Sequence, residues 1–202
     1  GAIVSLIDKR RGNREMVRSG DRRMNDLGPG NGTIAVAEAG PVSATLRVSS
    51  SGPLVHTTSI TLFRDSSRID IRNEIQQTFG DIRTWDFNVD LDLPELRHEE
   101  IGAVILGRLT GDGGHYADQA ARYDWLSLNH FADLTAGGSG LTISSPDLSF
   151  FRRGDSTPKF FDTQSPRLSI LAGGQVDGSS LGISSQGGDG DFLQRFALEA
   201  HG

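Results

Sequence analysis

The stretch TWDFNVDLDL, residues 84–93, alternates strictly between apolar and polar side chains. Its apolar positions are Trp85, Phe87, Val89, Leu91 and Leu93. Because successive side chains of a β-strand point to opposite faces, this pattern predicts a strand with one buried face and one solvent-facing face. Three carboxylates, those of Asp86, Asp90 and Asp92, are then expected on the solvent face.

Short segments of this kind continue along the whole chain. The 26 glycines divide the 202 residues, and almost no segment shows helical periodicity. Many short strands joined by Gly-, Ser- and Asp-rich turns are typical of an antiparallel β-sandwich or barrel. We therefore expect an all-β antiparallel β-sandwich that forms a single domain over residues 1–202. The expected strands are Ala2–Ile7, Thr33–Ala39, Ser43–Ser49, Val55–Arg64, Ser67–Ile75, Thr84–Leu93, Ile101–Leu106, Leu126–Leu134, Gly140–Ser144, Leu148–Arg152, Leu168–Ala172 and Phe192–Glu199.

One hairpin can be predicted directly. Asp65 and Ser66 form a tight connection between the expected strands Val55–Arg64 and Ser67–Ile75. In the second of these strands the isoleucines are expected on one face and the charged residues on the other. The charged residues are Arg68, Asp70, Arg72 and Glu74.

Composition excludes several classes of protein. A net charge of −6 argues against a broad nucleic-acid surface, and no apolar run is long enough to cross a membrane, so neither partner is expected. The chain has no cysteine, which excludes disulfides, thiolate metal sites and cysteine nucleophiles. This composition is compatible with a reducing compartment and favours a cytoplasmic location. A basic segment, residues 9–23, is either a solvated loop or an interface with an acidic partner surface.

The sequence offers few local catalytic or metal-binding patterns. Asp90 and Asp92 share one face of the expected strand, about 6.5–7 Å apart, a separation similar to that of carboxyls in inverting glycosidases. Any D-x-D on a strand produces this spacing, and a solvated face keeps both acids ionised, so we do not expect a catalytic pair. The five histidines show no metal-ligand spacing, and neither a G-x-S-x-G elbow nor a P-loop occurs.

The densest mixture of polar and aromatic residues lies in GGHYADQAARYDWLSLNHFADL, residues 113–134. Sugar recognition uses flat apolar faces together with planar polar groups. The alternative is that these aromatic residues belong to the core. If the stretch binds carbohydrate, the candidate residues are Tyr123, Trp125, Asn129, His130 and Asp133.

Six stretches together resemble one enzyme family. They are GAIVSLIDKRRGNREMV at 1–17, GPVSATLRVSS at 40–50, LFRDSSRIDIRNEI at 62–75, LRHEEIGAVI at 96–105, ARYDWLSLNHFADL at 121–134 and FLQRFALEAH at 192–201. In this order they resemble the C-terminal β-domain of glycoside hydrolase family 38, the α-mannosidases, over nearly the whole chain.

The resemblance implies a non-catalytic sandwich, similar to a galactose-mutarotase-like super-sandwich. Members of the family are retaining exo-glycosidases whose zinc ligands and aspartate nucleophile lie in an N-terminal domain and the region after it, and none of those motifs occurs in this chain. We therefore expect no catalytic residue and no cofactor here, with zinc held by the N-terminal catalytic domain. The opening strand-like stretch GAIVSLID is expected to lie within a longer protein.

Several functions follow as alternatives. The leading one is a domain that braces the catalytic domain of the same polypeptide and contacts mannose-containing carbohydrate. A second is an autonomous carbohydrate-binding module, which predicts an exposed aromatic platform containing Trp125, Tyr123 or Trp85. A third is a structural or oligomerisation sandwich with a large apolar surface patch. The last is an enzyme that would use Asp90, Asp92 and Glu99.

Overall fold

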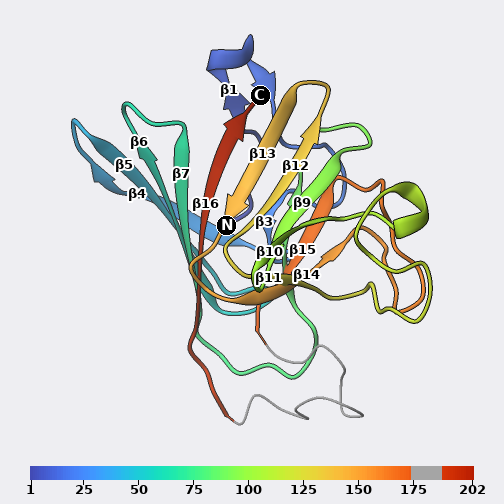
Figure 1. Ribbon diagram of the computed structural model, residues 1–202. Coiled ribbons are helices and arrows are strands. Elements are labelled where there is room, and N and C mark those ends of the chain that lie inside the picture. The colour runs from blue at the N-terminus through green and yellow to red at the C-terminus, as the bar shows by residue number, and fades with distance from the viewer. Residues whose placement is uncertain (174–187) are drawn as a thin grey trace.

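In the computed structural model, which describes residues 1–173 and 188–202, two antiparallel sheets pack face to face (Figure 1). One sheet has the order β10-β9-β12-β13-β16-β7-β6-β5-β4, the other has the order β11-β14-β15-β8-β3, and β1 and β2 form a small separate hairpin. This arrangement confirms the predicted antiparallel β-sandwich. The strands are β1 Ile7–Asp8, β2 Arg14–Glu15, β3 Met24–Asp26, β4 Gly32–Ala39, β5 Ser43–Ser50, β6 His56–Phe63, β7 Arg68–Ile75, β8 Thr84–Asn88, β9 Glu95–Glu100, β10 Ala103–Leu106, β11 Leu126–Leu128, β12 Phe131–Ala136, β13 Ser139–Ser144, β14 Ser149–Arg153, β15 Arg167–Leu171 and β16 Phe192–His201.

The core lies between the two sheets and is built from the apolar positions of the alternating strands. Trp85 and Phe87 on β8 are fully buried, as their alternation predicts. Aromatic rings in contact across the interlayer space supply large buried areas at favourable angles. Three such pairs are Phe87–Phe196, His56–Trp85 and His98–Phe151, with ring centroids 5.0, 5.5 and 5.1 Å apart.

The last strand of the sequence occupies the middle of the nine-stranded sheet. β16 pairs with β7 through eight residue pairs, from Phe192↔Ile75 to Glu199↔Arg68, and with β13 on its other side. The predicted β6–β7 hairpin is confirmed, with Leu62 opposite Ile69. In β7 the isoleucines are buried and the charged residues face outward, also as predicted.

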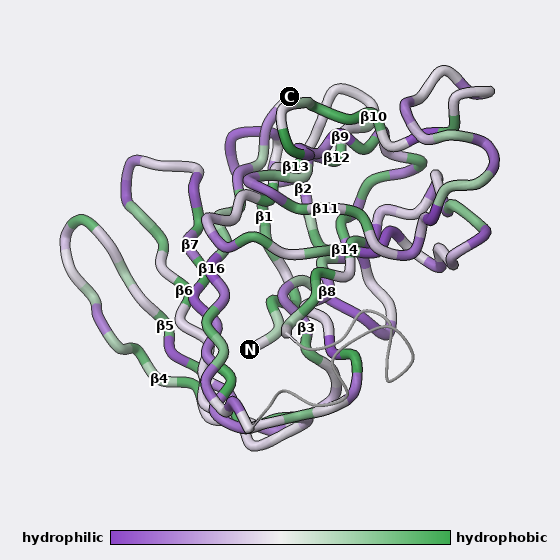
Figure 2. Tube along the Cα trace, turned by 60° about the horizontal axis from the view of Figure 1, so that its bottom comes forward, coloured by the Kyte–Doolittle hydropathy of each residue, from purple (hydrophilic) through white to green (hydrophobic). Residues whose placement is uncertain are grey.

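The nine-stranded sheet extends beyond the five-stranded sheet at one edge. We call β4 and β5 the wing; in both ribbon and tube views this hairpin projects away from the rest of the molecule (Figures 1 and 2). All eight residues of β4 are exposed. Ile34 and Val36 keep 71% and 66% of their surface exposed, so the apolar inner face of the sheet continues into solvent here.

Three expected strands differ from the structure, and one observed strand, β9, was not expected. The segment Leu126–Leu134 is divided into β11 and β12, which belong to different sheets. The expected first strand, Ala2–Ile7, is limited to an isolated bridge at Ile3 and the start of β1. β9 was not expected at all, because ELRHEE places only Leu96 and His98 on its buried face. The segment Thr84–Leu93 is regular only as far as Asn88.

A fully buried arginine joins three loops that are distant in sequence. Arg153, the last residue of β14, donates hydrogen bonds to the backbone oxygens of Pro94, Gly107 and Ser165 at 2.5, 3.3 and 2.9 Å. Burial lowers the pKa of Arg153 to about 10. The side chain is thus stabilised by carbonyl dipoles on segments that are distant in sequence.

A buried histidine links β9 to the loop that follows β10. His98 lies with Nδ1 2.9 Å from the backbone oxygen of Ser127 and with Nε2 2.9 Å from the hydroxyl of Tyr116. The same hydroxyl donates to Glu100 at 2.8 Å. Burial lowers the pKa of His98. The Ser127 carbonyl can only accept, so Nδ1 carries the proton of the neutral imidazole, and Nε2 and Glu100 then compete for the one hydroxyl proton of Tyr116.

Helical structure in the described residues consists of two short 3-10 turns, Lys9–Arg11 and Thr110–Asp112. In the part of the chain that the structure describes, no helix is long and apolar enough to cross a membrane.

Candidate functional site

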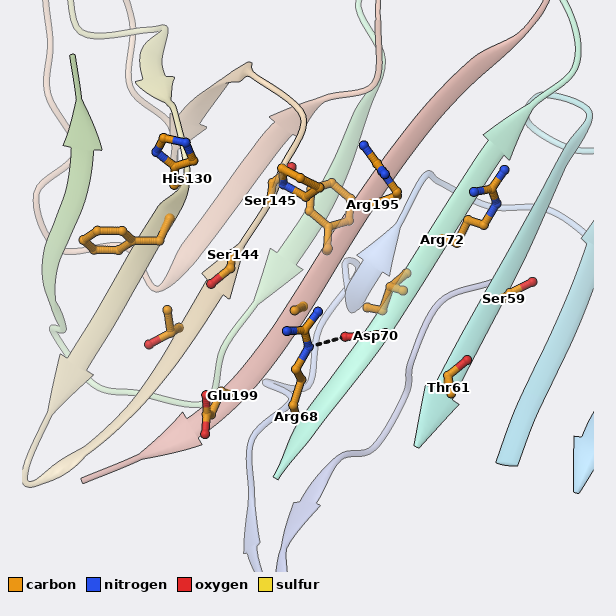
Figure 3. A pocket seen from close by; sticks show the side chains of 16 residues that line it. Ser59, Thr61, Arg68, Asp70, Arg72, His130, Ser144, Ser145, Arg195 and Glu199 are labelled. Carbon is orange, nitrogen blue, oxygen red and sulfur yellow. Dashed lines mark hydrogen bonds and ion pairs between the residues drawn. The ribbon is translucent and has the colours of Figure 1, made fainter. Parts of the chain in front are cut away.

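A groove of about 780 Å³ crosses the outer face of the nine-stranded sheet, over strands β12, β13, β16, β7 and β6 (Figure 3). We call it the outer-face groove. The residues that line it are Ser59, Thr61, Arg68, Asp70, Ile71, Arg72, His130, Phe131, Thr142, Ser144, Ser145, Pro146, Arg195, Phe196, Ala197 and Glu199.

Strand register places polar side chains next to one another in this groove. Asp70 on β7 lies opposite Thr61 on β6 and Ala197 on β16. Directly opposed side chains on one face of a sheet lie about 4.5–5.5 Å apart at Cβ, so such neighbours can share one ligand. The next outward-facing row brings together Ser59, Arg72 and Arg195.

The arginines of the groove each lie beside a carboxylate. Arg68 Nε is 2.5 Å from Asp70 Oδ1, and Arg72 Nη2 is 2.6 Å from Glu74 Oε1. In the same row the guanidinium of Arg195 contacts Asp147, which lies just outside the groove. Glu74 and Asp147 lie outside the groove, whose own charged groups include the guanidiniums of Arg68, Arg72 and Arg195 and the carboxylates of Asp70 and Glu199.

Asp147 anchors one end of this arrangement. Arg195 donates to it from Nη2 at 2.6 Å, from Nε at 3.2 Å and from its backbone nitrogen at 2.8 Å. The hydrogen bond from the Arg195 side chain lowers the pKa of Asp147. Arg72 contributes in the same direction through its charge. The carboxylate is thus held ionised and is poorly suited to act as a general acid.

The groove is suited to a neutral ligand with several hydroxyl groups. A hydroxyl both donates and accepts, so it can bridge a guanidinium and a carboxylate. Ser59, Thr61, Thr142 and Ser144 add hydroxyls of their own. Phe131 is half-buried and offers part of an aromatic face to the C–H surface of a ring-shaped ligand.

The residues predicted from the polar–aromatic stretch do not form one site. Tyr123 is 4% exposed; its ring stacks on Phe161 with centroids 5.6 Å apart, and its hydroxyl donates to the Ala117 carbonyl at 2.5 Å. Trp125 is partly exposed, with the guanidinium of Arg152 5.5 Å from its ring centroid. The expectation of an exposed platform is therefore wrong for Tyr123, and also for Trp85, which is fully buried.

The other three predicted residues are on or near β12. His130 is exposed, lines the outer-face groove and places Nδ1 2.9 Å from Glu99 Oε2. Asn129 is half-buried in the turn before β12. Asp133 is also half-buried; it lies 2.6 Å from His201 Nε2 and accepts a hydrogen bond from Thr142. His130 is thus the predicted residue that the structure places in the groove.

The acidic face of residues 84–93 is neutralised from within the chain. Asp86 is 4% exposed rather than solvated, because Arg22 covers it with Nε 3.3 Å from Oδ2. Arg18 pairs with Asp92 at 2.7 Å and lies 3.7 Å from Asp90. The basic segment is therefore neither a free loop nor wholly available to a partner, since two of its arginines bind this strand.

Residues 1–173 and 188–202 contain no set of side chains that could bind a metal ion. No group of three or more His, Asp or Glu side chains is arranged there to hold a metal ion. The family resemblance places zinc in the N-terminal catalytic domain, and that expectation stays a prediction.

The outer-face groove could not be read from local motifs. Its residues come from five strands and the loops next to them, between positions 59 and 199, and the strand register brings most of them together. The alternation in RIDIR did predict that Arg68, Asp70 and Arg72 share the outward face.

Comparison with known proteins assigns no family to this chain. No protein-family model matches the chain, and no curated protein matches its sequence. The chain is similar to a solved galactose mutarotase-like protein from Lactobacillus casei ATCC 334, at 14% identity and a TM-score of 0.44, over 99% of this chain and 93% of that one. A likeness at this level says nothing about ligand or activity. The observed class is an antiparallel β-sandwich with a polar groove on its larger sheet.

Proposed function

We propose that this chain is a non-catalytic β-sandwich domain of an α-mannosidase-like glycoside hydrolase, and that it binds mannose-containing carbohydrate. The observation that carries the binding proposal is the outer-face groove, which is lined by guanidinium, carboxylate and hydroxyl groups. The six stretches that resemble the C-terminal β-domain of glycoside hydrolase family 38 support the assignment of the parent enzyme. In this proposal the domain works beside the catalytic domain of the same polypeptide.

The chemistry of the groove favours binding over hydrolysis. Its carboxylates Asp70 and Glu199 lie beside donors: Arg68 faces Asp70, and the hydroxyl of Ser67 donates to Glu199 at 3.0 Å. A carboxylate that already accepts from a neighbouring donor is a poor candidate for the acid that protonates a leaving group. The acids considered as an enzymatic set, Asp90, Asp92 and Glu99, are likewise paired with Arg18 or His130.

Carbohydrate binding can be tested by titrating the chain with mannose and short α-mannosides while amide chemical shifts are recorded by NMR. We expect saturable shifts in β7, β12 and β16 around the groove. The variant His130→Ala removes a groove side chain that is exposed and therefore costs little stability. It should weaken binding several-fold, whereas Trp125→Ala should not.

The control variant separates two locations for the sugar. If Trp125→Ala abolishes binding and His130→Ala leaves it unchanged, the sugar binds at the loop tryptophan and the groove assignment is wrong. If neither sugar produces saturable shifts at millimolar concentration, carbohydrate binding by this chain is refuted.

A scaffold role is a second candidate, and the wing favours it. Its exposed apolar residues correspond to the surface patch that a structural or oligomerisation sandwich requires. Bracing a catalytic domain and binding a sugar use different faces of the sheet, so the two roles are compatible.

A further inference from the structure

A second, smaller pocket lies between the β1–β2 hairpin and the inner face of the nine-stranded sheet, next to the last residues of β16 (Figure 1). We call it the hairpin pocket; its volume is about 210 Å³. Its floor is apolar, because register aligns Leu62 on β6, Ile69 on β7 and Leu198 on β16 in one row. Arg14 of the hairpin donates to the hydroxyl of Ser139 on β13 at 2.8 Å, which fixes the hairpin over this end of the sheet.

The apolar lining of the hairpin pocket runs from the core to solvent. Met16 is 1% exposed and Leu141 is fully buried, whereas Leu62 keeps 47% of its surface exposed. The pocket therefore opens to solvent at Leu62. A water molecule occupies about 30 Å³ in the liquid, so this volume corresponds to about seven heavy atoms of a ligand. A short aliphatic chain fits such a space.

Two cations stand at the mouth of the pocket. Lys9 and Arg10, in the 3-10 turn that follows β1, are exposed and line it. Within residues 1–173 and 188–202, neither side chain forms an ion pair or a hydrogen bond with another residue. Asp8 also lines the pocket, but its carboxylate lies 3.1 Å from Nε of Arg11 and accepts from the backbone nitrogen of Arg10 at 3.0 Å. The mouth therefore carries positive charge that the described part of the chain does not neutralise.

The turn between β6 and β7 adds a hydroxyl on the other side of the mouth. Ser66 lines the pocket and accepts a hydrogen bond from the backbone nitrogen of Arg68 at 3.1 Å, so its own proton can be donated to a ligand. The basic segment of the sequence thus has two parts. Arg18 and Arg22 pair with carboxylates of residues 84–93, whereas Lys9 and Arg10 face the pocket.

We propose that the hairpin pocket binds a short aliphatic carboxylate, with its chain on the apolar floor and its carboxylate between Lys9, Arg10 and the hydroxyl of Ser66. Hydrogen bonds from cations to a carboxylate are stronger than those between neutral groups, and the chain removes apolar surface from water. The pocket lies on the inner face of the sheet, so this inference does not rest on sugar binding in the outer-face groove.

Titration of the chain with sodium hexanoate, followed by amide chemical shifts in NMR spectra, tests this inference. We expect saturable shifts at millimolar ligand in β1, in the turn between β6 and β7, and at the end of β16. Along the series from acetate to hexanoate, each added methylene should strengthen binding about fourfold. The gain should end at about eight carbons, because the volume of the pocket is then used up. 1-Hexanol should bind about tenfold more weakly than hexanoate, since it lacks the charge.

Variants separate the contribution of the mouth from that of the floor. Lys9→Glu combined with Arg10→Glu reverses the charge of two exposed side chains and should weaken hexanoate binding about tenfold or more. Arg47→Glu combined with Lys159→Glu is the matched control, because it changes the net charge equally at exposed positions outside the pocket. Ala200→Leu fills part of the pocket and should remove binding of hexanoate while leaving the fold intact.

Saturable binding that depends on Lys9 and Arg10 and gains nothing from longer chains supports the proposal. Three results would overturn it: shifts that do not saturate at millimolar hexanoate, equal weakening by the two double variants, or 1-hexanol binding as tightly as hexanoate. Affinity that keeps rising beyond about eight carbons would also contradict it, because the chain would then lie on an open surface rather than in a pocket of this volume.

Discussion

Arg153 provides a quantitative test of how the loops of this sandwich are held. Replacing it by methionine keeps much of the side-chain volume but removes the donors for the carbonyls of Pro94, Gly107 and Ser165. Hydrogen bonds from a charged group contribute about 1.5–3 kcal/mol each, so three of them amount to roughly 4–9 kcal/mol. Methionine carries no charge, so the variant no longer has the free-energy cost of burying the guanidinium, and this offsets several kcal/mol of that sum.

The expected net loss for Arg153→Met is about 3 kcal/mol, which is about a hundredfold change in the unfolding equilibrium. Urea unfolding followed by tryptophan fluorescence measures this directly, since Trp85 is fully buried. Arg152→Met is the matched control: its guanidinium lies over the half-exposed Trp125, a contact that contributes about 0.5–1 kcal/mol.

A free energy of unfolding for Arg153→Met within about 0.5 kcal/mol of wild type would refute this reasoning. So would equal losses in the two variants, because the burial of Arg153 would then have no energetic consequence of its own.

Two further predictions concern stability. Burial lowers the pKa of His98 below its usual 6.5, so its contribution to stability is fully present above that pH and is lost as the pH falls through the lower folded pKa. Chemical unfolding at a series of pH values should show this loss, and His98→Gln should flatten the profile; an unchanged slope would contradict it. Arg22→Met leaves the buried carboxylate of Asp86 without its cation and should cost about 1–3 kcal/mol, whereas Asp92→Asn, at an exposed ion pair, should cost under about 0.5 kcal/mol. Equal thermal shifts for the two variants would contradict this ranking.

The fold could be predicted because apolar and polar residues alternate along most strands, and this alternation shows which face of each strand is buried. Residues 84–93 show both the strength and the limit of that pattern. Trp85, Phe87, Val89 and Leu91 are buried as expected. Asp86 is buried too, because the segment around Arg22 covers the second face of β8, a contact between elements about sixty positions apart. Alternation within one strand carries no information about such a covering segment.

The ends of the strands, and the points where the chain passes from one sheet to the other, also could not be predicted from the local sequence. Leu126–Leu134 was expected to form one strand, yet the chain turns at Asn129 and His130, and the two halves belong to different sheets. β9 was not predicted because its outward-facing residues are charged and one of its two buried residues is a histidine, His98.

The candidate site was the part of the structure least predictable from the sequence. The mixture of polar and aromatic residues in the sequence predicted a site in residues 113–134 instead. In the structure Tyr123 is part of the core instead. The groove lies where five strands place their outward-facing polar residues next to one another. Of the five residues predicted to bind carbohydrate, His130 lines the outer-face groove.

The central position of β16 has a consequence for how the protein is made. Every other strand of the nine-stranded sheet leaves the ribosome before Phe192–His201 does, and until then β7 and β13 have no strand between them. Until then the blocks β7-β6-β5-β4 and β10-β9-β12-β13 each have an unpaired hydrogen-bonding edge where β16 will pair. Such long-range pairing is slow, and exposed edges attract other chains. A ribosomal pause shortly before codon 192 should therefore be a point of vulnerability to aggregation, and chaperone binding during synthesis should be strongest there.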